Sequence, residues 1–197
     1  LDHLIKRFRL HTDQLFKKHH MEPVGYWRPT DGTARERRKF VYILKHPSRY
    51  EAYQNWNAFT HDQQWKKVLE QPEFQRLLTE RPTSIFMMAN DYAEKVRTPI
   101  TKTGGIYELR TYTTAENKLT LLNARFANHT TEFFMKHGMS NIDYWTPYDR
   151  PGSGNTLIYL LHHTSREKAD KNWQAFSKDL GWQRVARDSQ SEGKLLI

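Results

Sequence analysis

The chain has 197 residues, with 31 Lys and Arg against 22 Asp and Glu and a formal net charge of +9. Aromatic residues make up 13%, which favours folded cores, and the absence of Cys excludes disulfides, Cys-ligated zinc and thiol nucleophiles. No segment is long and apolar enough for a membrane span, and the basic excess is spread except at residues 35–39, so we expect neither a membrane span nor a nucleic-acid partner.

The sequence of residues 1–89 predicts a long helix, a hairpin, two helical pieces and a strand. The chain opens inside the long helix, and the hairpin loop contains Gly32 and three Arg residues, Arg35, Arg37 and Arg38. Ser48-x-x-Glu51 has the form of a capping box, which predicts the start of a helix. Thr83–Ala89 predicts a strand, and residues 90–104 predict a linker that contains Pro99 and Gly104-Gly105.

The second part begins with an alternating run, Ile106–Tyr112, that predicts a strand. Thr113-x-x-Glu116 predicts a capping box before a long helix that ends near Lys136. Residues 141–147 and 156–163 predict the two strands of a hairpin, joined by a Pro-Gly-Ser-Gly-Asn turn.

After this hairpin, Thr164-x-x-Glu167 predicts another capping box. It opens a helix that carries Trp173, and a second helical piece runs through Trp182 and Val185. Trp56 and Trp65 have the same helical spacing in the first part, and we interpret all four Trp side chains as core residues.

The chain contains one pattern twice. Residues between Arg7 and Asp31 return 118 positions later, and residues between Tyr42 and Val68 return 117 positions later. A period of this length indicates a domain-sized unit rather than a short solenoid repeat. We therefore predict a first repeat over residues 1–89, a linker over 90–104 and a second repeat over 105–197.

Each complete repeat would read strand, helix, strand, strand, helix, strand, which is the ferredoxin-like arrangement. The first strand has no counterpart in the first repeat, and the last strand has none in the second. We therefore expect the chain to be a fragment that lacks roughly ten to fifteen residues at each end, together with any targeting peptide.

The opening strand Gly105–Tyr112, the His-x7-His pattern of the long helix, the Tyr-Trp strand and the Trp-bearing later helices resemble the NIPSNAP family. This resemblance implies an α+β fold in which two ferredoxin-like units pack sheet to sheet. Here the tandem repeats would form an intrachain dimeric α/β-barrel.

The resemblance also implies two classes of function. The wider superfamily includes haem-degrading monooxygenases and other small-molecule enzymes, which implies a small organic ligand in a helix–sheet cleft and a cofactor-independent or haem-dependent reaction. Animal NIPSNAP proteins are associated with mitochondria and with vesicle or mitophagy roles, which implies a non-catalytic interaction or scaffold protein. The sequence itself requires no cofactor, and haem is implied by superfamily analogy alone. The resemblance further implies a homo-oligomer. It also implies either a bacterial protein that is soluble or exported, or a mitochondrial protein.

The long helix predicts a stripe of five residues that faces the sheet: Leu122, Phe126, His129, Phe133 and His137. The first repeat carries His11 and His19 at the same places. A buried imidazole acts as a general base, a ligand anchor or an axial ligand, or is simply a core histidine with a satisfied hydrogen bond. The enzyme interpretation predicts a cavity beside His129 and His137. Because eight residues correspond to about 12 Å along a helix, we expect no two-histidine metal site.

Glu108 and Arg110 lie on the same face of the opening strand, together with Tyr112. If both faces of the sheet are covered, these charges must pair with each other or with a ligand. One interpretation is a structural ion pair that holds the two repeats in register. The other is an anion-binding arginine in a pocket whose wall includes Tyr144 or Trp145, together with Tyr159 and His163.

Overall fold

The computed structural model describes residues 1–100, 104–191 and 193–197. The chain divides into two compact units, Leu1–Thr83 and Ser84–Ile197, which we call unit 1 and unit 2. The fold is α+β with two antiparallel sheets, as predicted. Residues 101–103 of the predicted linker lie outside the described residues, and the sheet-to-sheet barrel stays a prediction.

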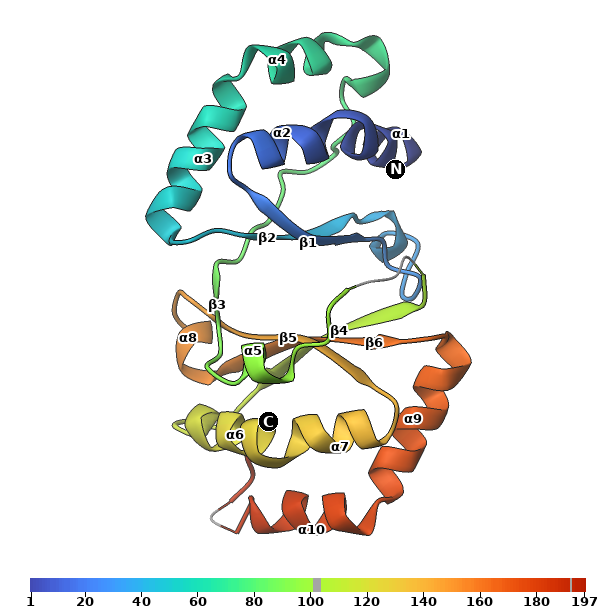
Figure 1. Cartoon of the computed structure of the whole chain (residues 1–197), viewed down its shortest axis with the longest axis vertical. Coiled ribbons are helices and arrows are strands. Elements are labelled where there is room, and N and C mark those ends of the chain that lie inside the picture. Colours follow the sequence, from blue (N-terminus) through green and yellow to red (C-terminus); the bar gives the residue numbers. More distant parts are fainter. Residues whose placement is uncertain (101–103, 192) are drawn as a thin grey trace. The chain divides into compact units, whose positions relative to one another are not determined.

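Unit 1 packs a two-stranded hairpin against one long helix, with two further helices beyond it (Figure 1). The long helix is α1 (Asp2–Arg7), the π-helical turn η1 (Phe8–Thr12) and α2 (Asp13–Lys18). The other elements are β1 (Glu22–Trp27), η2 (Glu36–Arg38), β2 (Val41–Lys45), α3 (Arg49–His61), α4 (Gln63–Glu70) and η3 (Pro72–Phe74).

Unit 2 packs helices against a four-stranded sheet with the order β3-β5-β6-β4. Its strands are β3 (Met87–Ala89), β4 (Ile106–Thr113), β5 (Ser140–Pro147) and β6 (Thr156–His163). The long helix is α6 (Leu119–Arg125), the π-helical turn η4 (Phe126–Thr130) and α7 (Thr131–Lys136). The other helices are α5 (Ala93–Val96), α8 (Gly152–Asn155), α9 (Arg166–Lys178) and α10 (Leu180–Asp188).

One of the three predicted capping boxes is confirmed. The Ser48 side chain accepts a hydrogen bond from the Glu51 backbone N–H and caps α3. In unit 2 the cap of α9 is Ser165, which accepts from Lys168, so the predicted box at Thr164 is wrong by one residue. The predicted box at Thr113 is also wrong, because Thr113 pairs with Thr156 as the last residue of β4.

The strand predicted to end the first repeat belongs to the sheet of unit 2. It is shorter than predicted, and β3 pairs antiparallel with the outer edge of β5, with Met87 opposite Pro147 and Ala89 opposite Trp145. The chain then turns inward at Asn90, and Ala93 of α5 is completely buried.

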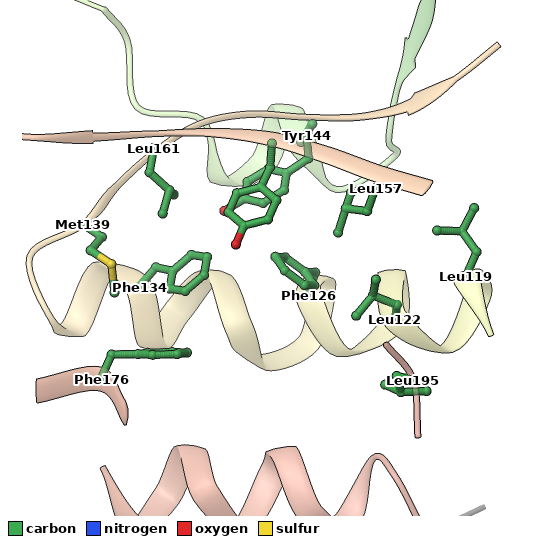
Figure 2. Packing of buried hydrophobic residues seen from close by; sticks show 12 residues of the cluster. Leu119, Leu122, Phe126, Phe134, Met139, Tyr144, Leu157, Leu161, Phe176 and Leu195 are labelled. Atoms are coloured by element: carbon green, nitrogen blue, oxygen red, sulfur yellow. The ribbon is translucent and has the colours of Figure 1, made fainter. Parts of the chain in front are cut away.

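The core of unit 2 lies between the sheet and the long helix, and Figure 2 shows Phe126 and Phe134 of the helix pointing toward Tyr144 and Leu157 of the sheet. The Phe126 ring lies 5.7 Å from Tyr144 and contacts it edge-on. Burial of one such aromatic side chain contributes roughly 1.5–3 kcal/mol. This packing fixes the helix face that is turned toward the sheet.

The π-helical turn η4 changes which residues of the long helix face inward. Its wider turn adds one residue, and the hydroxyls of Thr130 and Thr131 bond to the carbonyls five residues earlier, at 3.2 Å each. As a result Thr130 is buried and His129 is exposed. The prediction that His129 faces the sheet is therefore wrong, because a regular helical period was applied across an irregular turn. Phe134 takes the core position that Phe133 was expected to fill.

Candidate functional site

His137 lies at the end of the long helix and binds Asp179, which stands between α9 and α10. The His137 Nε2 atom is 2.8 Å from Asp179 Oδ2, and Lys136 Nζ is 2.6 Å from the same oxygen. The other oxygen, Oδ1, accepts hydrogen bonds from the backbone N–H groups of Gly181 and Trp182. Asp179 therefore caps α10 and fastens it to the long helix.

Unit 1 has the same arrangement at its equivalent residues. His19 Nε2 and Lys18 Nζ lie 2.7 and 2.6 Å from Asp62 Oδ2, and Asp62 caps α4. In both units the lysine, then the histidine, hold the pKa of the aspartate well below its usual range. A histidine–aspartate contact at the same place in both repeats supports the core-histidine interpretation of His19 and His137.

Glu108 is the centre of a polar cluster on the helix-facing side of the unit 2 sheet. Its Oε1 accepts from Arg110 Nη1 at 2.6 Å, and its Oε2 accepts from Trp173 Nε1 at 2.7 Å. His163 Nε2 is 3.2 Å from the same Oε2. The Arg110 guanidinium also lies over the Trp173 ring, 4.5 Å from its centre. These contacts join β4 to β6 and to α9.

Burial by itself would raise the pKa of Glu108, but the hydrogen bonds from His163, Trp173 and Arg110 outweigh it and lower the pKa to about 2. Glu108 and Arg110 keep about 30% of their side-chain surface exposed, at 29% and 32%. Their contacts agree with the structural ion-pair interpretation, and the partners named here all lie within unit 2. Whether the pair holds the two repeats in register stays a prediction.

The other predicted ligand-binding residues of unit 2 are buried. Tyr144 and Tyr159 are completely buried in the core, and their rings stack 5.6 Å apart. Burial raises the pKa of both phenols well above the usual range. Trp145 is also buried but follows Tyr144 along the strand and so points to the opposite face of the sheet. His163 joins the Glu108 cluster, whereas Trp145 lies on the opposite face of the sheet from Tyr144.

His11 is half-buried, and its ring meets Phe74 edge-on at 5.6 Å. It therefore packs against the segment after α4, apart from the His19 contact with Asp62. The structure thus brings Glu108, Arg110 and His163 together and separates the histidines of each long helix.

A cavity of about 460 Å³ lies in unit 1, between the long helix and the hairpin. We call it the unit 1 groove, and its lining residues are Ile5, Phe8, Arg9, Asp13, Tyr26, Trp27, Arg28 and Phe40. The Phe8 ring contacts Phe40 and Tyr26 edge-on, at 4.7 and 5.6 Å, so the groove has an aromatic floor. Its position is a helix–sheet cleft, the kind of site that the family resemblance implies.

The unit 1 groove carries an excess of positive charge. Arg9 and Arg28 are exposed, and no carboxylate binds either one among the residues that the structure describes. Asp13 is already engaged, because its Oδ1 accepts from the Tyr26 hydroxyl at 2.8 Å and its Oδ2 from Lys17 at 2.7 Å. Burial, and then the hydrogen bond to Asp13, raise the pKa of Tyr26 above its usual range. The groove therefore offers two guanidinium groups to an anion.

Sequence reasoning missed these residues because it followed what the two repeats share. Arg9 and Arg28 correspond to Ala127 and Thr146, so the signal lay in the differences between the repeats. A second cavity in unit 1, of about 430 Å³, is lined by Arg7, Leu69 and residues 74–78. Neither cavity is lined by His129 or His137, where the enzyme interpretation expected one.

His129 and His137, the two histidines predicted for the long helix of unit 2, are poorly placed to hold a haem iron. His129 is exposed on the helix surface, and the Nε2 atom of His137 is committed to Asp179. Within the described ranges, no group of three or more His, Asp or Glu side chains is placed to hold a metal ion. In the same residues, no helix combines the length and the apolar character needed to cross a membrane.

Comparison with known proteins gives one match. The NIPSNAP family model matches residues 1–92 and again residues 107–195. No curated protein and no solved structure matches the chain. The two matches together cover far more than half of the chain, so this protein belongs to the NIPSNAP family, with two tandem copies of the family's domain.

Proposed function

We propose that this protein binds a small organic ligand in the unit 1 groove, and that the ligand has an apolar body and an anionic group. One observation carries this proposal: an aromatic cleft of about 460 Å³ is lined by Arg9 and Arg28. In the described part of the chain, no carboxylate pairs with either arginine. Pockets for small molecules are usually 300–1,000 Å³ in volume, mostly apolar and provided with a few polar groups that orient the ligand.

The aromatic residues and the arginines of the groove would bind different parts of the ligand. The Phe8 and Phe40 rings would cover the apolar body, and Tyr26, whose ring is nearly parallel to that of Phe40, extends this surface. Arg9 and Arg28 would hold the anionic group through charge-assisted hydrogen bonds, which are about twice as strong as neutral ones. Ligands without a negative charge should therefore bind weakly.

The proposal is for binding without catalysis. Glu108 and Arg110, two candidate catalytic residues, bind each other, and His137 binds Asp179. In the groove, the carboxylate of Asp13 already accepts from Tyr26 and Lys17, so it is poorly placed to act as a general base.

A fluorescence titration with 8-anilinonaphthalene-1-sulfonate, an aromatic sulfonate, tests the proposal. The wild-type chain should give a saturable increase in fluorescence, and the double variant Arg9→Ala/Arg28→Ala should weaken binding at least tenfold. The matched control is Arg35→Ala/Arg81→Ala, which removes two exposed positive charges from the same unit and should leave the affinity within twofold. Equal weakening by both double variants would show a general charge effect and would overturn the proposal.

A second variant tests the cavity independently of charge. Ile5 lines the groove and is only partly buried, so Ile5→Trp should fill the space without opening the core. We expect this variant to lose sulfonate binding while its thermal unfolding midpoint stays close to that of the wild type. Undiminished binding in a folded Ile5→Trp variant would place the ligand elsewhere.

A further inference from the structure

The long helix of each unit buries an arginine that no carboxylate neutralises in the described part of the chain. Arg7 of unit 1 and Arg125 of unit 2 stand 118 positions apart, and each is only 8% exposed. Among the described residues, neither guanidinium forms an ion pair, and the Nε atom of each is buried without a hydrogen-bond partner. A buried charge is costly unless it is paired and hydrogen-bonded, so both positions favour a bound counter-ion.

The surroundings of the two arginines are repeated as well. The Arg7 guanidinium lies over the Trp65 ring, 5.1 Å from its centre, and the Arg125 guanidinium lies over the equivalent Trp182 ring at 5.4 Å. Stacking covers the flat face of a guanidinium and leaves its N–H groups, which lie in the plane of the group, to other acceptors. In the described residues, Arg125 Nη1 has the Ser189 hydroxyl at 3.3 Å, and the Arg7 side chain has no acceptor.

A phenol lies near each arginine, but it does not balance the charge. Tyr42 interacts electrostatically with Arg7, and the equivalent Tyr159 interacts with Arg125. Burial raises the pKa of both phenols, so they are neutral. Burial also lowers the pKa of both arginines below the usual value, and the phenols offset only part of this effect. The positive charge is therefore left uncompensated in both units.

The acidic side chains nearest in the fold already have other partners. In unit 2 the opening strand β4 is in place, and its one acidic residue, Glu108, binds Arg110, Trp173 and His163. In unit 1, Glu73 precedes the cavity residue Phe74 and binds Lys6 at 2.6 Å. The two carboxylates are thus committed to other side chains.

A π-helical turn follows each of the two arginines directly. Arg7 precedes η1 and Arg125 precedes η4. The carbonyl of each arginine accepts a hydrogen bond from a threonine hydroxyl five residues later, at 3.3 Å from Thr12 and at 3.2 Å from Thr130. Single π-helical turns inside α-helices frequently occur at functional sites. The same irregularity beside the same arginine in both units favours a binding role for this residue.

In unit 1 the buried arginine reaches a cavity. Arg7 lines the cavity of about 430 Å³ together with Arg76 and apolar side chains that include Leu69 and Phe74. This cavity shares no lining residue with the unit 1 groove. Because more than nine-tenths of each buried arginine is covered by protein, an anion that reaches its N–H groups has to be small. A guanidinium is weakly hydrated, which favours an anion that also loses its water easily.

We propose that each unit binds a small monovalent anion of the chloride class at its buried arginine, Arg7 or Arg125, through the N–H groups of the guanidinium. The anion would supply the counter-charge beside the tryptophan of α4 or α10. This inference is independent of the proposed function, because neither arginine lines the unit 1 groove.

The chlorine-35 NMR line width of sodium chloride solutions tests this inference with the full chain, because chloride that exchanges with a protein site relaxes faster than free chloride. The wild-type chain should give an excess line width that saturates with chloride concentration. Arg7→Gln and Arg125→Gln should each remove about half of this excess, and the double variant should remove nearly all of it. The matched control Arg81→Gln/Arg184→Gln removes one exposed arginine from each unit and should keep nearly all of it.

A competition experiment on the wild-type chain needs no variant to fold. At constant ionic strength, bromide should displace chloride and abolish the excess line width, whereas the much larger gluconate anion should leave it within about 20% of its starting value. Equal effects of bromide and gluconate would show screening rather than a site and would overturn the proposal. An excess line width that the folded double variant keeps, or one that does not saturate in the wild type, would overturn it as well.

Discussion

Tyr26 and Tyr144 stand at equivalent positions of the two units, but their surroundings differ. The Tyr144 ring is completely buried and covered by Tyr92 at 5.3 Å, whereas the Tyr26 ring lines a cavity and its hydroxyl donates to Asp13 at 2.8 Å. Among the described residues, Tyr92 thus covers Tyr144 in unit 2, and Tyr26 lines the unit 1 groove. This difference is the basis of the proposed ligand site.

Asp62 should stabilise unit 1 through its helix cap as well as its ion pairs. Asp62→Ala removes the cap of α4, which costs about 1 kcal/mol, together with the contacts to Lys18 and His19. Asp62→Asn keeps a capping side chain and should recover a large part of the loss. Urea unfolding curves compare the two variants. Equal destabilisation by Ala and Asn would show that the cap contributes little.

The contribution of Glu108 to stability should depend on pH. The folded-state pKa is about 2 against an ordinary value of 4.5, so the stabilisation is complete above pH 4.5 and is lost as the pH falls toward 2. After allowance for solvent screening, we expect about 1–2 kcal/mol. The difference in unfolding free energy between wild type and Glu108→Gln should therefore shrink as the pH is lowered from neutral to about 3. A difference that stays constant over this range would be incompatible with an ionised Glu108 in the cluster.

Replacing Arg110 should lower the free energy of unfolding and leave ligand binding in the unit 1 groove unchanged. Arg110→Ala removes the ion pair with Glu108 and the contact with the Trp173 ring, and we expect a loss of roughly 2–3 kcal/mol, because a half-buried carboxylate loses its arginine partner and keeps only Trp173 and His163. Sulfonate binding in the unit 1 groove should stay within twofold of wild type. Chemical denaturation gives the first quantity and the fluorescence titration the second. A stable variant with weakened binding would instead support the anion-binding interpretation of Arg110.

The repeat and the hairpins could be predicted from the sequence, because residue type and alternation specify them locally. The inward face of the long helix could not be predicted from the sequence. The turn η4 adds one residue, and a regular helical period does not account for the resulting change in the direction of His129. The pairing of β3 with β5 depends on contacts such as Asn90 with Asn123, which join residues far apart in the sequence. The unit 1 groove could not be predicted from the repeat, because Arg9 and Arg28 are not part of the repeated pattern.

The site itself is tested most directly by an NMR titration of the isotope-labelled chain with the aromatic sulfonate, since the two units provide matched positions in one molecule. The account predicts saturable shifts of backbone amides around Phe8 and Tyr26, with little change at the equivalent Phe126 and Tyr144. Equal shifts at both sets of amides, or shifts confined to unit 2, would contradict a ligand site in the unit 1 groove.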